Sequence, residues 1–431
     1  MLAPNLSVNE TSHLCFAGRD VTELAEKYGT PLYLLDEDMI RARCRLYLTA
    51  MRASFGEGAL PLYAGKALCV TALYRIMREE GMGIDVVSSG EIYTAYTAGF
   101  PMERAYFHGN NKTDADIAYA MTCGVGTFVC DSVDELDAIE WEAASRGITQ
   151  GVLLRLTPGI DPHTHAAIST GKVDSKFGAA IETGQAEALL CEALARPHVA
   201  VRGYHCHIGS QIFETTPFID AARIMLTFTA AMQRAHGFTP AELNLGGGMG
   251  VRYLAEHPCI DYAENIAVIA AEAKATATAL GIELPAIRME PGRSIVADAG
   301  MTLYTVGSVK CIPGFKNYVS VDGGMPDNPR FALYESPYTV EPADRMGDTR
   351  DFVCTVAGRC CESGDLIQEG VVLPRPARGD LLAVLTTGAY NYAMASNYNR
   401  IPRPPMVMLS GGEDRLIVRR ESFEDLVRNE L

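Results

Sequence analysis

Short apolar runs alternate with longer amphipathic segments between about residue 60 and residue 295. The apolar runs predict eight strands: Pro61–Ala64, Ile84–Val87, Ala105–His108, Thr127–Cys130, Val152–Leu156, Val201–Ile208, Leu243–Leu245 and Ala286–Met289. Segments between them, such as Thr71–Glu80, Asp134–Ser145 and Phe218–Ala235, carry apolar residues at three- and four-residue spacing, which predicts amphipathic helices. Ser88–Glu91 and Ser132–Glu135 resemble capping boxes that would begin two of these helices.

Each apolar run is joined to the next by a segment long enough for a helix. This order predicts an α/β fold with parallel strands closed into a (β/α)8 TIM barrel over residues 36–296, and an open doubly wound sheet is the alternative. The gap between the fifth and sixth strands is about 45 residues long and contains Asp161–Gly178. We interpret that stretch as a functional loop rather than as a missed strand.

After about residue 297 the pattern changes to short alternating runs that are separated by Gly and Pro. They predict a C-terminal all-β domain over residues 297–431, with strands at Leu303–Val309, Tyr318–Val321, Phe352–Val356, Leu381–Leu385, Val407–Leu409 and Arg415–Arg419. The N-terminal segment, residues 1–35, ends in a further apolar run, Pro31–Leu35. We expect this run to pair with the C-terminal strands and to complete their domain, and we expect a short helix within Ser422–Leu431.

The composition indicates a packed soluble protein of 431 residues, of which 48% are hydrophobic and 21% charged. The net charge of −16 argues against nucleic acid or an anionic membrane as the main partner, although local arginines could still bind small anions. The 12 cysteines show no zinc-type spacing, which suggests reduced cysteines in a cytoplasmic protein. We recognise no signal peptide and no apolar stretch of the roughly 20 residues that span a bilayer.

Polar residues gather where the predicted barrel strands end, and barrel enzymes carry their chemistry at that edge. These residues are Lys66, Asp85, Ser88, Ser89, His108, Arg155, His205, His207, Ser210, Glu290 and Arg293. Gly246–Gly248 after the seventh strand, with Gly292 and Arg293 after the eighth, could cradle a phosphate, although three glycines alone would equally suit a tight turn.

Lys66 has two explanations of about equal weight on position alone: a structural ion pair, or covalent use. A neighbouring phosphate site favours a phosphate-bearing aldehyde that is bound to Lys66 as an imine. His207 is the better candidate for stacking on a flat ring, whereas His205 suits a packed core histidine. We expect no metal site, because no third zinc ligand is evident.

Specific motifs occur along nearly the whole chain, from Tyr28–Tyr33 to Ser396–Asn399. They are Tyr63–Ala67, His108–Lys112, Asp174–Gly178, His205–Gln211, Gly246–Gly248, Glu290–Arg293, Cys361–Asp365 and Gly388–Tyr390. On these motifs the chain resembles the diaminopimelate decarboxylase family, which belongs to the alanine-racemase-like, fold type III class of pyridoxal-phosphate enzymes.

The resemblance implies that pyridoxal 5'-phosphate is the cofactor and that Lys66 holds it as a Schiff base. By the same resemblance His207 stacks on the pyridine ring and Glu290 pairs with the pyridine nitrogen. The residues around the phosphate would be Ser210, Gly248, Gly292, Arg293 and Tyr390. A carboxylate beside the ring nitrogen keeps that nitrogen protonated, which favours decarboxylation over racemisation.

The resemblance also implies the substrate, meso-2,6-diaminopimelate, which would be converted to L-lysine and CO₂ in the last step of lysine biosynthesis. The substrate-binding residues would be Arg293, Arg330, Tyr334, Glu362 and Tyr390. Cys361 would protonate the product carbanion or line the site, and Cys361 and Glu362 would reach the active site of a second subunit in a homodimer.

Several alternatives remain open on the sequence. Arg330 could serve only as a bridge between domains, and Cys361 could be a buried strand cysteine. The substrate could be another amino acid, such as ornithine, arginine or carboxynorspermidine, or the protein could be a non-catalytic pyridoxal-phosphate carrier.

Overall fold

The computed structural model describes residues 2–160 and 175–431 and divides into two compact units. The first, which we call the barrel unit, contains Arg43–Gly250 and Ile260–Gly292. The second, the β unit, contains Met1–Ala42, Val251–Cys259 and Arg293–Leu431. Most of the loop expected at Asp161–Gly178 lies outside the described residues, which include only its last four positions. The domain boundaries at residues 36 and 296 stay a prediction.

The barrel unit contains a closed ring of eight parallel strands, as the alternating pattern predicted. In ring order these are β9 (Gln150–Thr157), β11 (Val199–His205), β12 (Glu242–Asn244), β13 (Ala286–Met289), β5 (Leu60–Ala64), β6 (Gly83–Val86), β7 (Ala105–Phe107) and β8 (Thr127–Cys130). Pairing of β8 with β9 closes the ring. The closed barrel is therefore confirmed, and the open doubly wound sheet is excluded.

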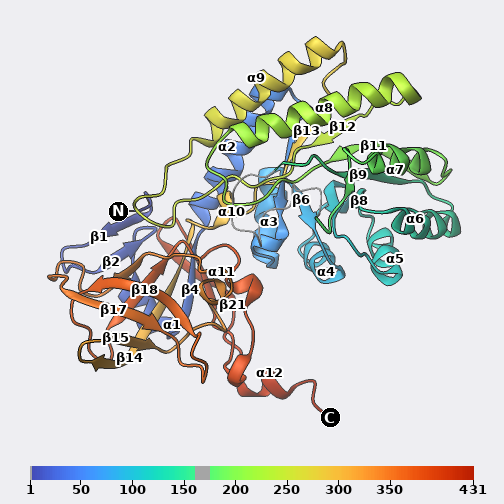
Figure 1. Cartoon of the computed structure of the whole chain (residues 1–431). Coiled ribbons are helices and arrows are strands. Elements are labelled where there is room, and N and C mark those ends of the chain that lie inside the picture. Colours follow the sequence, from blue (N-terminus) through green and yellow to red (C-terminus); the bar gives the residue numbers. More distant parts are fainter. Residues whose placement is uncertain (1, 161–174) are drawn as a thin grey trace. The chain divides into compact units, whose positions relative to one another are not determined.

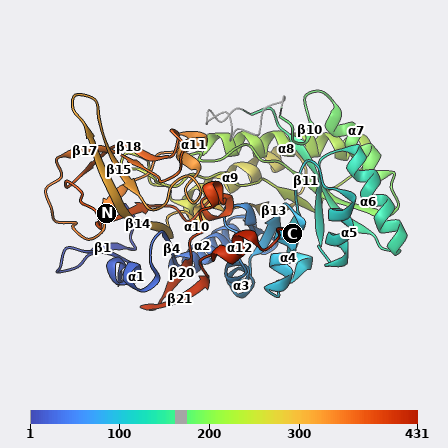
Figure 2. The ribbon, with the colours of Figure 1, turned by 90° about the horizontal axis from the view of Figure 1, so that it is seen from below.

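Helices follow most of the barrel strands, and helices that are neighbours in the chain pack against one another (Figures 1 and 2). They are α3 (Thr71–Glu80), α4 (Ser89–Thr97), α5 (Asp114–Thr122), α6 (Val133–Arg146), α7 (Gln185–Leu194), α8 (Thr216–His236) and α9 (Tyr262–Leu280). A further helix, α2 (Glu37–Phe55), precedes β5. The helices expected around residues 71–80, 134–145 and 218–235 are thus present, each within two residues of its expected ends.

Two details of the predicted barrel differ from the structure. Ser88 and Ser132 do cap α4 and α6, but Glu91 and Glu135 accept from the N–H groups of Val87 and Asp131, so the capping boxes are not closed. The long segment after β9 also contains a two-residue strand, β10 (Ala179–Ala180), which pairs with β9 outside the ring. Strands this short leave too weak a pattern to detect in a sequence.

The β unit is built around strand β4 (Leu32–Asp36) from the N-terminal segment. It lies between β14 (Gly300–Ile312), to which it is antiparallel, and β20 (Met406–Ser410), to which it is parallel. The rest of this sheet contains β15 (Lys316–Val321), β16 (Val340–Pro342), β17 (Phe352–Ala357), β18 (Leu366–Leu373), β19 (Leu381–Leu385) and β21 (Glu413–Val418). The predicted completion of the C-terminal sheet by the N-terminal segment is confirmed.

Burial explains why the N-terminal strand joins this sheet. Leu32 and Leu34 are fully buried in one core with Leu303 and Val407, so that segments far apart in the sequence share one apolar cluster. A small sheet, β1 (Leu6–Val8), β2 (Leu14–Phe16) and β3 (Arg19–Asp20), precedes the helix α1 (Val21–Tyr28). The terminal helix is present as α12 (Phe423–Val427), and a short helix, α11 (Arg330–Tyr334), interrupts the strands.

Candidate active site

The carboxyl ends of the barrel strands bring together most of the polar residues that the sequence placed there, because parallel strands all end at the same edge. Lys66 lies directly after β5 in a single 3₁₀ turn, Gly65–Ala67, and its side chain is exposed. Gly65 allows this turn, since a Cβ at that position would lie 2.3 Å from the hydroxyl of Tyr74. The sequence therefore presents an accessible amine at the end of the first barrel strand.

Glu290 follows β13 and is the centre of a buried polar cluster. Its Oε1 lies 2.9 Å from Nε2 of His108 and accepts a 2.7 Å hydrogen bond from Nδ2 of Asn244. Its Oε2 lies 3.2 Å from Nε2 of His205. The other end of the Asn244 amide accepts from the N–H of Gly246 at 2.9 Å, which fixes the orientation of the side chain. Three strand ends thus position one carboxylate.

The protonation states of His205 and Glu290 follow from their burial and from the groups that contact them. His205 is buried and its Nδ1 has no hydrogen-bond partner, so the ring is neutral and donates from Nε2. Burial lowers the pKa of His205 to about 4, against the attraction of Glu290. Burial would raise the pKa of Glu290, but His108 and His205 outweigh it and hold that pKa well below its usual value. Glu290 is therefore a carboxylate anion at neutral pH.

His207 and the three-glycine turn are held together by one contact. Nδ1 of His207 accepts a 3.2 Å hydrogen bond from the N–H of Gly247, which fixes the ring tautomer and orientation. Burial and the charge of Lys66 hold the pKa of His207 well below its usual value, so a neutral, flat ring is presented.

The glycines in this region are required by close backbone approach. A Cβ at Gly247 would lie 2.0 Å from the carbonyl oxygen of Glu290, and one at Gly248, whose φ is +123°, would lie 2.3 Å from that of Gly209. A Cβ at Gly292 would lie 2.9 Å from that of Ala64. Ser210 is half-buried in the segment after β11. The turns that follow three neighbouring strands are thus packed backbone to backbone.

The β unit contains a second polar cluster, made of arginine and tyrosine. The guanidinium carbon of Arg293 lies 4.7 Å from the ring centre of Tyr390, and that of Arg330 lies 5.2 Å from the same ring. Arg330 is also 5.1 Å from the ring of Tyr334, four residues later at the end of α11. Tyr390 has a φ of +63°, an unusual conformation for a non-glycine residue. Four residues predicted to bind substrate or cofactor thus lie in one cluster.

Arg330 is a buried cation without an acidic partner. Its side chain donates to Ser336 Oγ at 3.3 Å, its Nε has no hydrogen-bond partner, and it forms no ion pair with any residue of the described chain. A buried charge of this kind is unfavourable unless a counter-charge arrives with a ligand. The cluster is therefore suited to a ligand carboxylate.

Cys361 and Glu362 lie on the surface of the β unit, between β17 and β18. Both are exposed; the N–H of Cys361 donates to Asn399 Oδ1 at 2.8 Å, and the Tyr398 hydroxyl donates to Glu362 at 3.5 Å. The alternative of a buried strand cysteine is wrong for Cys361.

Three members of the barrel cluster, His108, His205 and Asn244, were not among the predicted site residues. His205 was expected to be a packed core histidine, and it is buried and bonded to Glu290. His108 had been noted at a strand end, and its position in that series was the available signal. Asn244 is a polar residue inside an otherwise apolar run, which is a weaker signal. One ligand atom each of His108, His205 and Glu290 lies within 4.8 Å of the others, so three potential metal ligands meet in the fold, although His207 is not among them.

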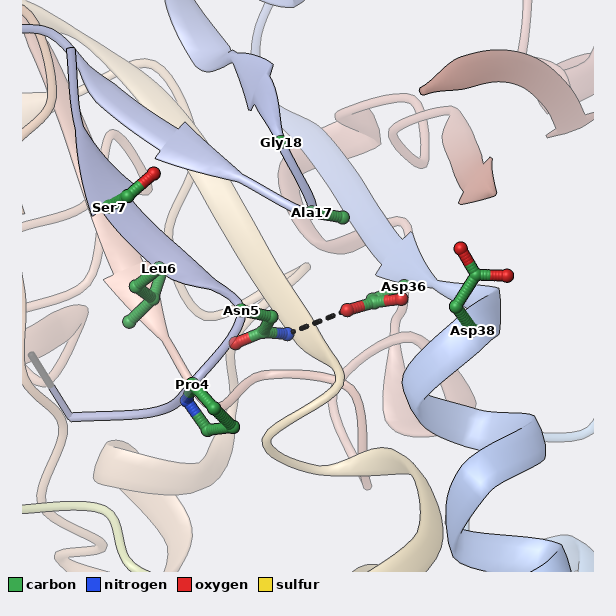
Figure 3. Close-up of a pocket in the computed structure, with 8 residues that line it drawn as sticks. All are labelled: Pro4, Asn5, Leu6, Ser7, Ala17, Gly18, Asp36 and Asp38. Carbon is green, nitrogen blue, oxygen red and sulfur yellow. Dashed lines mark hydrogen bonds between the residues drawn. The ribbon is translucent and has the colours of Figure 1, made fainter. Parts of the chain in front are cut away.

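A separate hollow of about 300 Å³ lies in the β unit, lined in part by Asn5, Asp36 and Asp38. Figure 3 shows Asn5 facing Asp36, to which it donates a hydrogen bond of 3.2 Å. Asp38 accepts from Ser410 and Gly411, and Asp36 accepts from the N–H of Met39. These carboxylates are committed to loop and helix-end contacts, and no predicted site residue lines the hollow.

Comparison with known proteins gives a consistent picture. Residues 37–297 match the family described as pyridoxal-dependent decarboxylase, pyridoxal binding domain. The diaminopimelate decarboxylase of Bacillus subtilis (strain 168) is 45% identical over 423 residues, which are 98% of this chain and 96% of that protein.

Solved structures agree with the sequence relatives. Diaminopimelate decarboxylase from M. jannaschii in complex with L-lysine superposes with a TM-score of 0.92 at 34% identity, over 99% of this chain and 98% of that chain. The Helicobacter pylori enzyme with L-lysine gives a TM-score of 0.86 at 32% identity, over 95% and 99% of the two chains. The chain therefore belongs to the pyridoxal-dependent decarboxylases, and within them to the diaminopimelate decarboxylase family.

Proposed function

We propose that this protein decarboxylates meso-2,6-diaminopimelate to L-lysine and CO₂, the last step of lysine biosynthesis, with pyridoxal 5'-phosphate as cofactor. The observation that carries the choice of substrate is the buried guanidinium of Arg330, which has no acidic partner and lies near the ring of Tyr390, as that of Arg293 does. Ornithine, arginine and lysine have no carboxylate at the end remote from the reaction, so they would leave the charge of Arg330 unpaired.

The barrel cluster fits this cofactor. An accessible lysine, a buried carboxylate anion and tightly packed glycine turns at one barrel end match an aldehyde, a ring nitrogen and a phosphate. When bound, pyridoxal phosphate supplies a protonated pyridine ring that withdraws electrons from the amine carbon of the substrate. Lys66 would hold it covalently at rest, and His207 would lie against the ring face.

Glu290 would keep the proton on the ring nitrogen. Because the contacts of His108, His205 and Asn244 stabilise its anionic form, it can hold a proton on its partner without taking that proton up. Ser210, Gly248, Gly292, Arg293 and Tyr390 would bind the phosphate through hydroxyl, backbone N–H and guanidinium groups.

The β-unit residues would bind the end of the substrate that does not react. Arg293, Arg330, Tyr334 and Tyr390 would hold its distal carboxylate by charge-assisted hydrogen bonds. Glu362 would pair with the adjacent ammonium group, and Cys361 would return a proton to the carbon that loses CO₂. The exposure of both side chains suits contact with a molecule outside their own unit.

We further propose a homodimer in which Cys361 and Glu362 of one subunit complete the active site of the other. The net charge of −16 argues against nucleic acid as a partner. None of the helices within residues 2–160 and 175–431 is long and apolar enough to cross a membrane. We propose a cytoplasmic location, in line with the many unpaired thiols among the described residues.

A substrate panel tests the proposal. Purified protein with added pyridoxal phosphate is offered meso-diaminopimelate, lysine, ornithine, arginine and carboxynorspermidine, and CO₂ release is measured for each. We expect release from meso-diaminopimelate alone. Release from another substrate would retain the cofactor chemistry but refute the roles of Arg330 and Glu362. If no CO₂ is released from any of the five compounds, a non-catalytic carrier or a racemase would be favoured.

A further inference from the structure

The segment Val251–Cys259 follows the three-glycine turn but belongs to the β unit, where several contacts fix Tyr253. The carbonyl oxygen of Tyr253 accepts from Thr339 Oγ1 at 2.8 Å, and that of Arg252 accepts from Thr386 Oγ1 at 3.5 Å. The Tyr253 ring packs edge-on against Tyr338, with ring centres 5.5 Å apart. Only 4% of Tyr253 is exposed, so its hydroxyl has a defined position.

This hydroxyl contacts Arg293. Nη1 of Arg293 donates to the Tyr253 oxygen at 2.7 Å, while the guanidinium lies 4.7 Å from the centre of the Tyr390 ring. A guanidinium is planar with its five N–H donors in a fixed fork. The Tyr253 hydroxyl holds one N–H of Arg293, and the Tyr390 ring lies near the guanidinium. Together these two contacts set the direction in which the other N–H groups of Arg293 point.

The Tyr253 hydroxyl is also chemically suitable as a partner for Arg293. A phenol hydroxyl is neutral, so it orients the guanidinium without cancelling its positive charge. A carboxylate at the same place would form an ion pair and compete with an anionic ligand. Tyr253 thus combines orientation with an undiminished attraction for a ligand carboxylate.

We propose that Tyr253 is a positioning residue that aims Arg293 at the distal carboxylate of the substrate and of the product L-lysine. This inference rests on the proposed function, because it assumes the substrate-binding role of Arg293. Tyr253 acts through Arg293 and takes no part in the chemistry at the reacting carbon. Loss of the hydroxyl should consequently weaken binding and leave the chemical step nearly unchanged.

The test is Tyr253→Phe in the pyridoxal-phosphate-loaded enzyme, with L-lysine affinity measured by calorimetry and with steady-state kinetics on meso-diaminopimelate. We expect the Kd of L-lysine and the KM to rise about tenfold, as for loss of a hydrogen bond to a charged group. We expect kcat to change less than about twofold. The cofactor absorbance and the melting temperature report whether the fold and the barrel cluster are intact.

A matched control is Tyr338→Phe. It removes an equally buried hydroxyl, which donates to Asn391 Oδ1 at 3.0 Å, from the ring that packs on Tyr253. The Kd of L-lysine should then stay within about twofold of wild type, since this hydroxyl does not contact Arg293. In an Arg293→Lys background, Tyr253→Phe should have no further effect on the Kd.

An unchanged L-lysine affinity in folded Tyr253→Phe would overturn the inference, and so would a fall in melting temperature alone. Equal losses of affinity in Tyr253→Phe and Tyr338→Phe would also overturn it, because they would indicate general packing. Wild-type protein that released no CO₂ from meso-diaminopimelate would instead refute the proposed function, and with it the basis of this inference.

Discussion

The two polar clusters of this protein were assembled in different ways. In the barrel unit, Lys66, His108, His205 and Glu290 each lie at or just after a strand end, and the parallel ring brings those ends to one edge. In the β unit, Arg330 and Tyr390 come from a short helix and a turn with a positive φ, and no repeated pattern marks them. Arg293 was marked only because it follows the eighth barrel strand in the sequence. Site residues at the ends of repeated strands can be recognised from the strand pattern in the sequence, whereas site residues in irregular segments cannot.

The clusters also differ in electrostatics. In the barrel unit both oxygens of the Glu290 carboxylate are held by imidazole and amide groups, so this charge has its partners before a ligand binds. In the β unit Arg330 is packed against aromatic rings without an acid, so a ligand is needed to complete the cluster. We therefore expect the barrel cluster to govern chemistry and stability, and the β-unit cluster to govern recognition.

The largest expected effect is in the barrel cluster, on replacing Lys66 by Arg. The charge is kept, but a guanidinium does not form the imine that an amine forms with the cofactor aldehyde. We expect kcat to fall on the order of 10⁴-fold or more. CO₂ release measures this, and borohydride reduction of wild-type protein should place the cofactor on the peptide that contains Lys66. Near-normal turnover would refute the assignment.

The same variant provides a rescue that tests the shared site. Lys66→Arg and Cys361→Ser proteins, each of low activity, are mixed, dissociated and reassembled. Mixed dimers would contain one site with both residues intact, so roughly a quarter of wild-type activity should return. No recovery would contradict the contribution of Cys361 from the partner subunit.

The next effect should be confined to the β-unit cluster. Arg330→Gln removes the buried charge, and the distal carboxylate would lose one of its two guanidinium partners, at about 2–5 kcal/mol, so kcat/KM for meso-diaminopimelate should fall on the order of 10²–10³-fold. Cofactor absorbance should be unchanged, because the barrel residues are untouched. Exposed Arg378, changed to Gln, is the control. If Arg330→Gln lost the cofactor as well, the division between the clusters would be wrong.

The smallest effect concerns stability and the barrel alone. The pKa of His205 is about 4 in the folded protein and about 6.5 unfolded, so its contribution is intact above pH 6.5 and is lost as the pH falls towards 4. The free energy of unfolding should fall by about 3 kcal/mol through this group. Urea denaturation of apoprotein at several pH values measures it, with His205→Gln expected to lose less on acidification. If wild type and His205→Gln lost the same free energy of unfolding on acidification, titratable groups other than His205 would be responsible.

The strands of the barrel could be recognised in the sequence for a physical reason. A buried parallel strand needs a short apolar run, and the residue after it lies at the edge where ligands bind; both features appear directly in the chain around Lys66 and Glu290. Strand β18 escaped prediction because most of its residues are exposed or half-buried, which removes the apolar signal. The role of Asn244 could not be foreseen, since it depends on the position of Glu290 across the strand register.

The sequence by itself determined the barrel, the sheet that the N-terminal segment completes, and the residue types for a pyridoxal-phosphate decarboxylase. Periodicity, strand-end chemistry and motifs are local properties that the chain displays before it folds. The tertiary structure decided which partners set the charge of Glu290, that Arg330 is buried without an acid, and that Tyr253 holds Arg293. These are contacts between residues distant in the sequence, and their energies depend on burial that only the packed fold creates.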